Sequence, residues 1–239
     1  MAKARRKIVI AGRLWLAVQY STAYSPSKAT RREIKAMIST PARESLNART
    51  SWQKLMLVLA ANFRREDLVV TLTYRDGQLP KHREEANKRL SYFVRLLRQQ
   101  RKSRGAPLVA VKITEGYHTG GRLHHHLIIN GTGADFHEIR QLWKRWGDDV
   151  DFEIFGTDGP ERWARYLTKE PREQGRRHVG DRTWTTTRNV KKPVVLPTEY
   201  VSQASALLPP PGSVILDRTE CQNGFGSFCQ MTAVLPEDN

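Results

Sequence analysis

The 239-residue sequence has few cysteines, no long apolar run and no nucleotide-binding loop. Its two cysteines, Cys221 and Cys229, are too few for a disulfide framework, which favours a reducing compartment. No run reaches the roughly 20 apolar residues that a membrane-spanning helix needs. The apolar stretch from Ile8 to Val18 is broken by Arg13 and lacks a clear cleavage site, so we expect a helix or arm there. Without a Gly-x-x-x-x-Gly-Lys-Ser/Thr loop, the chain is not expected to contain a helicase.

Acidic residues are scarce relative to basic ones. The chain has 40 Lys and Arg against 24 Asp and Glu, a formal net charge of +16. Such an excess predicts a polyanionic partner, and nucleic acid is the commonest. The charge is uneven, because residues 1–50 carry +9 and residues 201–239 carry −3. We therefore expect the N-terminal segment, and not the tail, to contact phosphate groups.

Strand and helix patterns alternate through the middle of the chain. Short apolar or β-branched runs predict strands at 68–74, 108–114, 122–129 and 150–155. Apolar residues at three- and four-residue spacing predict helices at 43–61, 83–102, 135–146 and 161–169. From the first strand on, the order is strand, helix, strand, strand, helix, strand, helix. This order is typical of the α+β, ferredoxin-like split βαβ fold, with helices on one face of an antiparallel sheet and its first and third strands in the middle.

The same patterns predict three parts of the chain. Residues 1–61 form a basic N-terminal arm and helix, and residues 62–193 form the main domain. Residues 194–239 form a Pro-rich linker followed by a small hairpin-like tail around Asn223-Gly224, to which we assign no chemistry.

Three consecutive histidines inside an apolar strand give the sharpest chemical signal. Alternate side chains of a strand share a face, so His124 and His126 would lie about 6.5–7 Å apart along one face, with His125 opposite. Glu115 ends the neighbouring strand and could reach the same ion. A His/His/Glu set leaves coordination positions open for substrate, as a catalytic metal site requires. The alternative, a solvated histidine tract, does not normally sit between apolar residues.

Tyr166 is the candidate nucleophile. Lys169 follows three residues later on the same helical face, and a nearby ammonium group eases loss of a phenol proton whose free pKa is near 10. The other interpretation is that Trp163, Tyr166 and Leu167 form an apolar core stripe. Four further tyrosines compete for the role, of which the first two could lie near the metal: Tyr74, Tyr117, Tyr92 and Tyr200.

Three motifs occur in one order and resemble those of HUH endonucleases, the rolling-circle replication initiators of the filamentous-phage and plasmid group. They are Val70-Thr71-Leu72-Thr73-Tyr74, Gly121-Arg122-Leu123-His124-His125-His126 and Tyr166-Leu167-Thr168-Lys169. The resemblance spans about residues 62–193. The sequence departs from the family at His125, where an apolar or aromatic residue is usual, and it resembles the class that has a single tyrosine.

The resemblance implies a chemistry for each of these residues. His124, His126 and Glu115 would bind Mg²⁺ or Mn²⁺ at the scissile phosphate of single-stranded origin DNA. Tyr166 would attack to give a 5′-phosphotyrosine link and a free 3′-OH, with Lys169 positioning or neutralising the phosphate. The expected partners are origin DNA and a host helicase and polymerase in a bacterial cytoplasm. The residues expected to contact the DNA are Arg122, Arg176, Arg177 and Arg188.

Two other hypotheses use the same features. A non-catalytic nucleic-acid-binding protein would keep the basic charge without chemistry. A His/His/Glu metallohydrolase would use water as the nucleophile, with Tyr166 merely packed.

Overall fold

The computed structural model describes residues 3–21, 41–116, 122–156, 159–169, 183–223 and 226–237. The chain divides into two compact units, which we treat separately. The first combines residues 1–40 with residues 192–239, and the second consists of residues 41–191. No helix in the described ranges is both long enough and apolar enough to cross a membrane.

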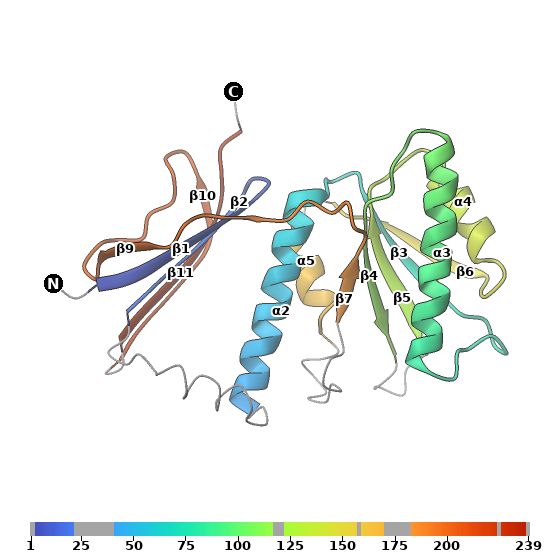
Figure 1. Ribbon diagram of the computed structural model, residues 1–239, viewed down its shortest axis with the longest axis horizontal. Coiled ribbons are helices and arrows are strands. Elements are labelled where there is room, and N and C mark those ends of the chain that lie inside the picture. The colour runs from blue at the N-terminus through green and yellow to red at the C-terminus, as the bar shows by residue number, and fades with distance from the viewer. Residues whose placement is uncertain are drawn as a thin grey trace. The chain divides into compact units, whose positions relative to one another are not determined.

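The second unit is built on a five-stranded antiparallel sheet (Figure 1). Its strands are β3 (Leu68–Thr73), β4 (Ala110–Glu115), β5 (His124–Ile129), β6 (Asp149–Ile154) and β7 (Trp184–Thr186). They are arranged in the order β6-β3-β5-β4-β7. The unit's first and third strands, β3 and β5, therefore lie in the middle of the sheet, as the sequence predicts.

Helices cover both faces of this sheet, so the prediction of helices on one face was wrong. The four helices are α2 (Pro41–Asn62), α3 (Arg83–Ser103), α4 (Asp135–Trp143) and α5 (Gly159–Tyr166). Figure 1 shows α3 and α4 on one side and α2 and α5 on the other. The error arose from α2, which was assigned to an N-terminal extension. It packs against α5 and buries Leu55 and Leu59 completely.

The strand period sorts the side chains of β3 and β5 between the two faces. Val70, Leu72 and Leu127 join the core beneath α3 and α4. Thr71 pairs with His126 in the ladder and points to the other face, toward α5. Because helices cover both faces, successive residues of a central strand are all buried, and this explains the unbroken apolar run in β5.

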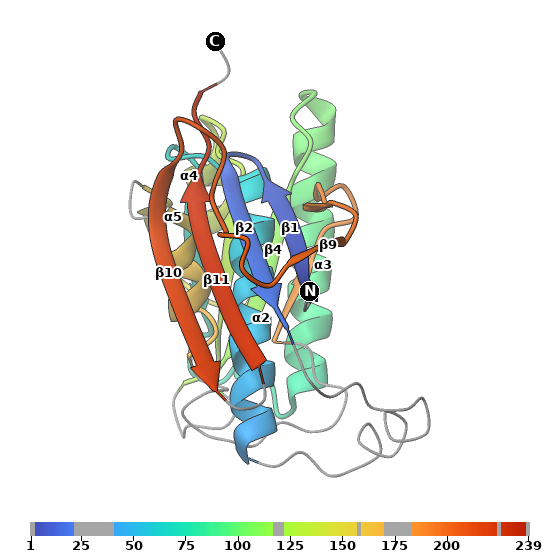
Figure 2. The same cartoon turned by 90° about the vertical axis from the view of Figure 1, so that its left-hand side faces the viewer.

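The first unit is a second antiparallel sheet, made from both ends of the chain (Figure 2). Its strands are β1 (Lys3–Ala11), β2 (Leu14–Tyr20), β8 (Val194–Val195), β9 (Glu199–Ser202), β10 (Val214–Asn223) and β11 (Gly226–Val234). The order is β10-β11-β2-β1-β8, and β9 also pairs with β1. The expected C-terminal hairpin is therefore present as β10 and β11, but it belongs to a larger sheet.

The expected N-terminal helix or arm at Ile8 to Val18 is instead a hairpin of β1 and β2. Gly12, with a φ of 56°, allows the two-residue turn that joins them. β2 also pairs with β11, so it lies inside the sheet and its residues from Leu14 to Ala17 are all buried. A buried strand of this kind has no apolar alternation and resembles a helical segment in sequence. The structure thus groups residues 1–61, 62–193 and 194–239 differently from the predicted boundaries.

Candidate metal centre

Glu115, His124 and His126 come together at one end of the central strands. Glu115 ends β4 and pairs in the ladder with His124, the first residue of β5. One ligand atom from each of the three residues lies within 4.8 Å of the others. The Nε2 atoms of His124 and His126 are 3.1 Å apart, and Glu115 Oε2 lies 3.7 Å and 3.5 Å from them. Two imidazoles on one ion with bonds of about 2.1 Å would have a similar nitrogen separation.

Hydrogen bonds to the far sides of the rings orient the two histidines. His124 Nδ1 lies 2.8 Å from the carbonyl oxygen of Arg122. A carbonyl only accepts, so this Nδ1 carries the proton and Nε2 keeps its lone pair. His126 Nδ1 lies 3.0 Å from the hydroxyl of Thr71, which can accept in the same way. Both Nε2 atoms then present lone pairs to the same point, an arrangement that a cation stabilises.

Glu115 supplies the negative charge of the cluster. Burial raises the pKa of this carboxyl, but hydrogen bonds and charge from His124 and His126 outweigh that effect and lower the pKa to about 2. The group is therefore ionised at neutral pH. Its Oε1 atom is buried and has no hydrogen-bond partner among the described residues. A buried carboxylate oxygen in this state favours a bound cation, so the residues fit a divalent metal.

His125 points away from this cluster, as the sequence predicts. Its ring is fully buried on the face of α3 and α4, where Nε2 lies 2.8 Å from the Tyr74 hydroxyl and Nδ1 lies 3.0 Å from Thr114 Oγ1. Burial, followed by the charges of His124 and His126, lowers the pKa of His125 to about 3. His125 is thus a neutral side chain of the core.

Tyr166 lies beside the histidine pair. It is the last residue of α5, and its ring centroid is 5.9 Å from that of His126, with the planes at 71°. The helix is anchored by Trp163, which is buried and donates from Nε1 to the Phe155 carbonyl at 2.7 Å. Tyr166 itself is 43% exposed, so it does not belong to the apolar core stripe that was the alternative. Lys169 places its Nζ 4.0 Å from the centre of the Tyr166 ring.

The competing tyrosines are less well placed. Tyr74 is buried on the opposite face, and burial raises the pKa of its phenol. Tyr92 lies on α3, over that same opposite face, and Tyr200 belongs to the first unit. Tyr117 lies outside the described residues. Of the tyrosines that the structure describes in the second unit, Tyr166 is the one in ring contact with a histidine of the cluster.

The four arginines expected at DNA are not gathered at this site. The guanidinium of Arg122 donates to the Tyr74 carbonyl and forms an ion pair with Asp76 at 2.9 Å. Arg188 follows β7 at the other end of the sheet, and Arg176 and Arg177 lie outside the described residues. Sequence reasoning missed Thr71 as a partner of His126. Its position opposite His126 in the ladder is the signal that would have identified it.

One comparison with known proteins gives a match. A family model for replication-associated proteins of the ORF2 type matches residues 67–175, a range that includes the metal cluster, Tyr166 and Lys169. No curated protein and no solved structure matches the chain. The family match supports a role in the initiation of replication.

Proposed function

We propose that this chain is a metal-dependent DNA nickase of the HUH type, which cuts single-stranded origin DNA and starts rolling-circle replication. The observation that carries the proposal is the contact between the rings of Tyr166 and His126, on the sheet face that also presents His124 and Glu115. A nucleophile and a metal-binding cluster are thereby within reach of one phosphate group. The match to the replication-associated family points to the same activity.

Glu115, His124 and His126 would hold Mg²⁺ or Mn²⁺. When bound, such an ion polarises the scissile phosphate and stabilises the charge that develops on its oxygens. Three protein ligands leave coordination positions for the phosphate and water. The carboxylate of Glu115 makes the set harder than two imidazoles alone, which suits a cation that binds phosphate oxygen.

Tyr166 would act as the nucleophile. Its phenol loses a proton as its oxygen forms a bond to the phosphorus, and the bond from phosphorus to the 3′ oxygen breaks. The leaving oxygen takes up a proton and becomes a free 3′-OH, while the 5′ phosphate stays on the tyrosine. The link conserves the phosphodiester energy, so the reverse reaction can rejoin the strand. The Lys169 ammonium, close to the phenol ring, would favour the phenolate and position the phosphate.

The free 3′-OH implies the partners. A host polymerase would extend it, and a host helicase would unwind the template, because the sequence has no nucleotide-binding loop for this task. The reaction would take place in the cytoplasm of a bacterial host. Arg122, Arg176, Arg177 and Arg188 are proposed contacts to the DNA backbone.

A covalent-adduct assay tests the proposal. The chain is incubated with Mn²⁺ and 3′-labelled single-stranded oligonucleotides that tile the DNA flanking its coding sequence, and the products are separated on a denaturing gel. We expect a labelled band at protein size that disappears with EDTA and in Tyr166→Phe. Tyr200→Phe, in the first unit and 66% exposed, is the matched control and should retain the band.

The other outcomes identify the other hypotheses. Cleaved DNA without an attached protein would support the water-using metallohydrolase and overturn the tyrosine mechanism. Bound but uncut DNA at every oligonucleotide would support the non-catalytic binding protein.

A further inference from the structure

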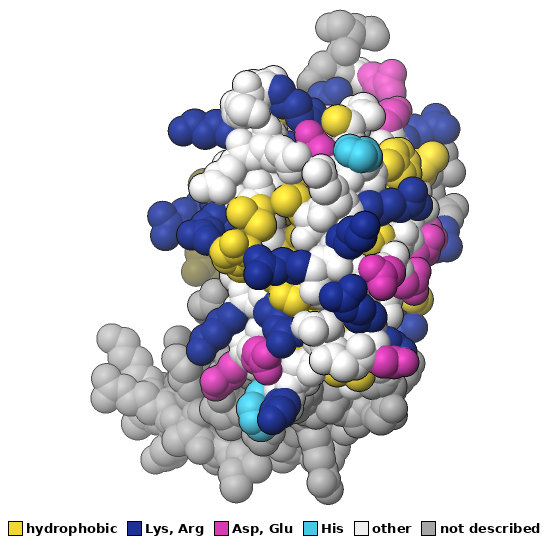
Figure 3. All heavy atoms as spheres, turned by 90° about the vertical axis from the view of Figure 1, so that its right-hand side faces the viewer, with side chains coloured by type: hydrophobic (Ala, Val, Ile, Leu, Met, Phe, Trp, Pro, Cys, Tyr) yellow, Lys and Arg dark blue, Asp and Glu magenta, His cyan; other side chains and the backbone are white. Residues whose placement is uncertain are grey.

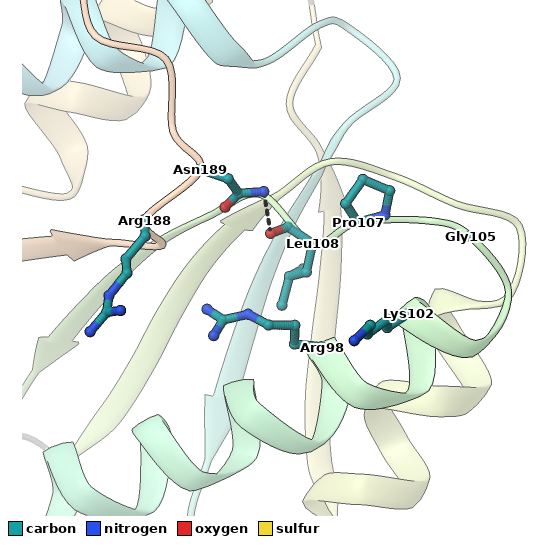
Figure 4. A pocket seen from close by; sticks show the side chains of 7 residues that line it. All are labelled: Arg98, Lys102, Gly105, Pro107, Leu108, Arg188 and Asn189. Carbon is teal, nitrogen blue, oxygen red and sulfur yellow. Dashed lines mark hydrogen bonds between the residues drawn. The ribbon is translucent and has the colours of Figure 1, made fainter.

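A second candidate site lies at the end of the sheet away from the metal cluster. A cavity of about 440 Å³ opens between the end of α3, the loop before β4 and the segment after β7 (Figure 4). Its lining includes an apolar floor of Pro107 and Leu108. Asn189 donates to the Leu108 carbonyl at 3.1 Å, which fixes the segment after β7 against the loop.

Three cations surround this floor. Arg98 and Lys102 come from α3, and Arg188 comes from the segment after β7. All three are exposed, and none of them forms an ion pair within the ranges that the structure describes. Figure 4 shows the guanidinium groups of Arg98 and Arg188 reaching toward the same side of the pocket. Uncompensated cations that converge on a hollow attract an anion.

The surroundings add to this positive potential. Lys112 is half-buried on the neighbouring strand, and burial, followed by the charge of Arg98, lowers its pKa. The face of α3 and α4 also displays many Lys and Arg side chains, as Figure 3 shows in dark blue. The pocket is therefore the concave part of a broader basic surface.

The pocket is distinct from the metal cluster. Thr187, next to Arg188, donates its backbone N–H to the carbonyl of Ala110 at the start of β4, whereas Glu115 ends that strand. Five residues of strand separate the two sites by about 17 Å. That distance equals about five nucleotides of one strand at the spacing of a duplex.

We infer that this pocket binds the phosphodiester backbone of the substrate DNA at a point several nucleotides from the scissile phosphate. The inference rests on the proposed function for its substrate. Arg98, Lys102 and Arg188 would contact consecutive phosphates, and a sugar or base edge would lie on Pro107 and Leu108. The site would hold the flanking DNA while the strand is cut and rejoined.

A binding assay without metal tests the inference. Fluorescence anisotropy in EDTA compares Arg98→Ala/Arg188→Ala with the unaltered pocket, both in a Tyr166→Phe background that cannot form an adduct. One oligonucleotide ends two nucleotides from the cleaved bond on each side, and others extend it by ten nucleotides on the 5′ or the 3′ side. Lys81→Ala/Lys88→Ala removes the same charge from exposed positions near the start of α3 and is the control.

We expect the pocket variant to bind one of the extended oligonucleotides about tenfold or more weakly than the control variant does. The slope of log affinity against log salt should become less negative by about 1.4, for two lost contacts to single-stranded phosphates. Binding of the short oligonucleotide should not change. Equal losses in the pocket and control variants, or an equal loss on short and extended DNA, would overturn the inference.

The result is independent of the cleavage chemistry. If the extended DNA depends on the pocket but the Mn²⁺ assay gives no adduct, the pocket stands and the nickase proposal fails. If the adduct forms and the pocket variant binds extended DNA like the control, the nickase proposal stands and the pocket inference fails.

Discussion

Thr71 Oγ1 lies 3.0 Å from Nδ1 of His126, across the ladder that joins β3 to β5. This hydrogen bond holds the imidazole so that its Nε2 faces Nε2 of His124. Partners of this kind on metal-binding histidines fix the ring and raise its basicity. Thr71 is thus a positioning residue of the proposed metal centre, and it would not itself touch the ion.

Thr71→Val should weaken Mn²⁺ binding about 10- to 100-fold, because the isosteric side chain cannot accept the Nδ1 proton. Calorimetric titration of the purified chain with Mn²⁺ measures this. Thr73→Val is the control: it lies beside His124 in the ladder, and no hydrogen bond from its hydroxyl to a histidine occurs among the described residues. Equal affinities in the two variants would show that Thr71 does not position His126.

Metal addition and removal should change the stability of the chain. A ligand that binds only the folded state at 100 times its dissociation constant adds about 2.7 kcal/mol. We therefore expect Mn²⁺ to raise the melting temperature, EDTA to reverse the rise, and Glu115→Gln to lose most of it. Glu84→Gln, an exposed carboxylate at the start of α3, should keep the full shift. A full shift in Glu115→Gln would remove that carboxylate from the site.

The geometry of the metal cluster could be predicted because it depends on two local rules. The strand period placed His124 and His126 on one face and His125 on the other. The hairpin register placed Glu115 opposite His124. Tyr166 was harder, since its helical neighbours fit a core stripe equally well. Only its exposure and its contact with His126 separate the two interpretations.

The remaining errors involve pairing between distant segments. β2 is a strand because it lies between β1 and β11, and β11 begins more than 200 residues later. Nothing local distinguishes its apolar run from a buried helix. In the same way, α2 could be predicted as a helix but not assigned to a sheet face, because its contact is with α5, about a hundred residues away.

His125, which departs from the family pattern, forms part of a buried chain of hydrogen bonds. Thr114 Oγ1 donates to Asn87 Oδ1 at 2.9 Å, so it accepts from His125 Nδ1, and His125 Nε2 accepts from the Tyr74 hydroxyl. Tyr74→Phe or His125→Leu should each lower the free energy of unfolding by about 1–3 kcal/mol, because each leaves a buried polar group without a partner.

The double variant Tyr74→Phe/His125→Leu should cost less than the sum of the two, by about 1 kcal/mol or more. Urea unfolding of the full chain measures all four members of this cycle. Additive costs would mean that the contact between Tyr74 and His125 contributes no net stability. Mn²⁺ affinity should survive in His125→Leu, which would distinguish this residue from its two neighbours.

Gly116 connects β4 to the loop that leads back to the histidine strand. Its φ of +89° belongs to the region that favours glycine, and a Cβ there would lie 2.9 Å from Leu123 Cα and closer still to the Arg122 carbonyl group. That carbonyl is the acceptor for His124 Nδ1. Gly116→Ala should therefore displace the segment that orients His124, as well as straining the backbone.

Gly77→Ala provides the matched control, because Gly77 has a φ of +79° but nothing within 4 Å of its would-be Cβ. Both variants should lose about 1–2 kcal/mol of stability from the left-handed backbone alone. We expect Gly116→Ala to lose more than this and also to bind Mn²⁺ at least about tenfold more weakly, while Gly77→Ala retains its metal affinity. Equal stability losses with unchanged Mn²⁺ affinity in both would show that His124 does not depend on the Arg122 carbonyl, because the loop can then shift without affecting the metal centre.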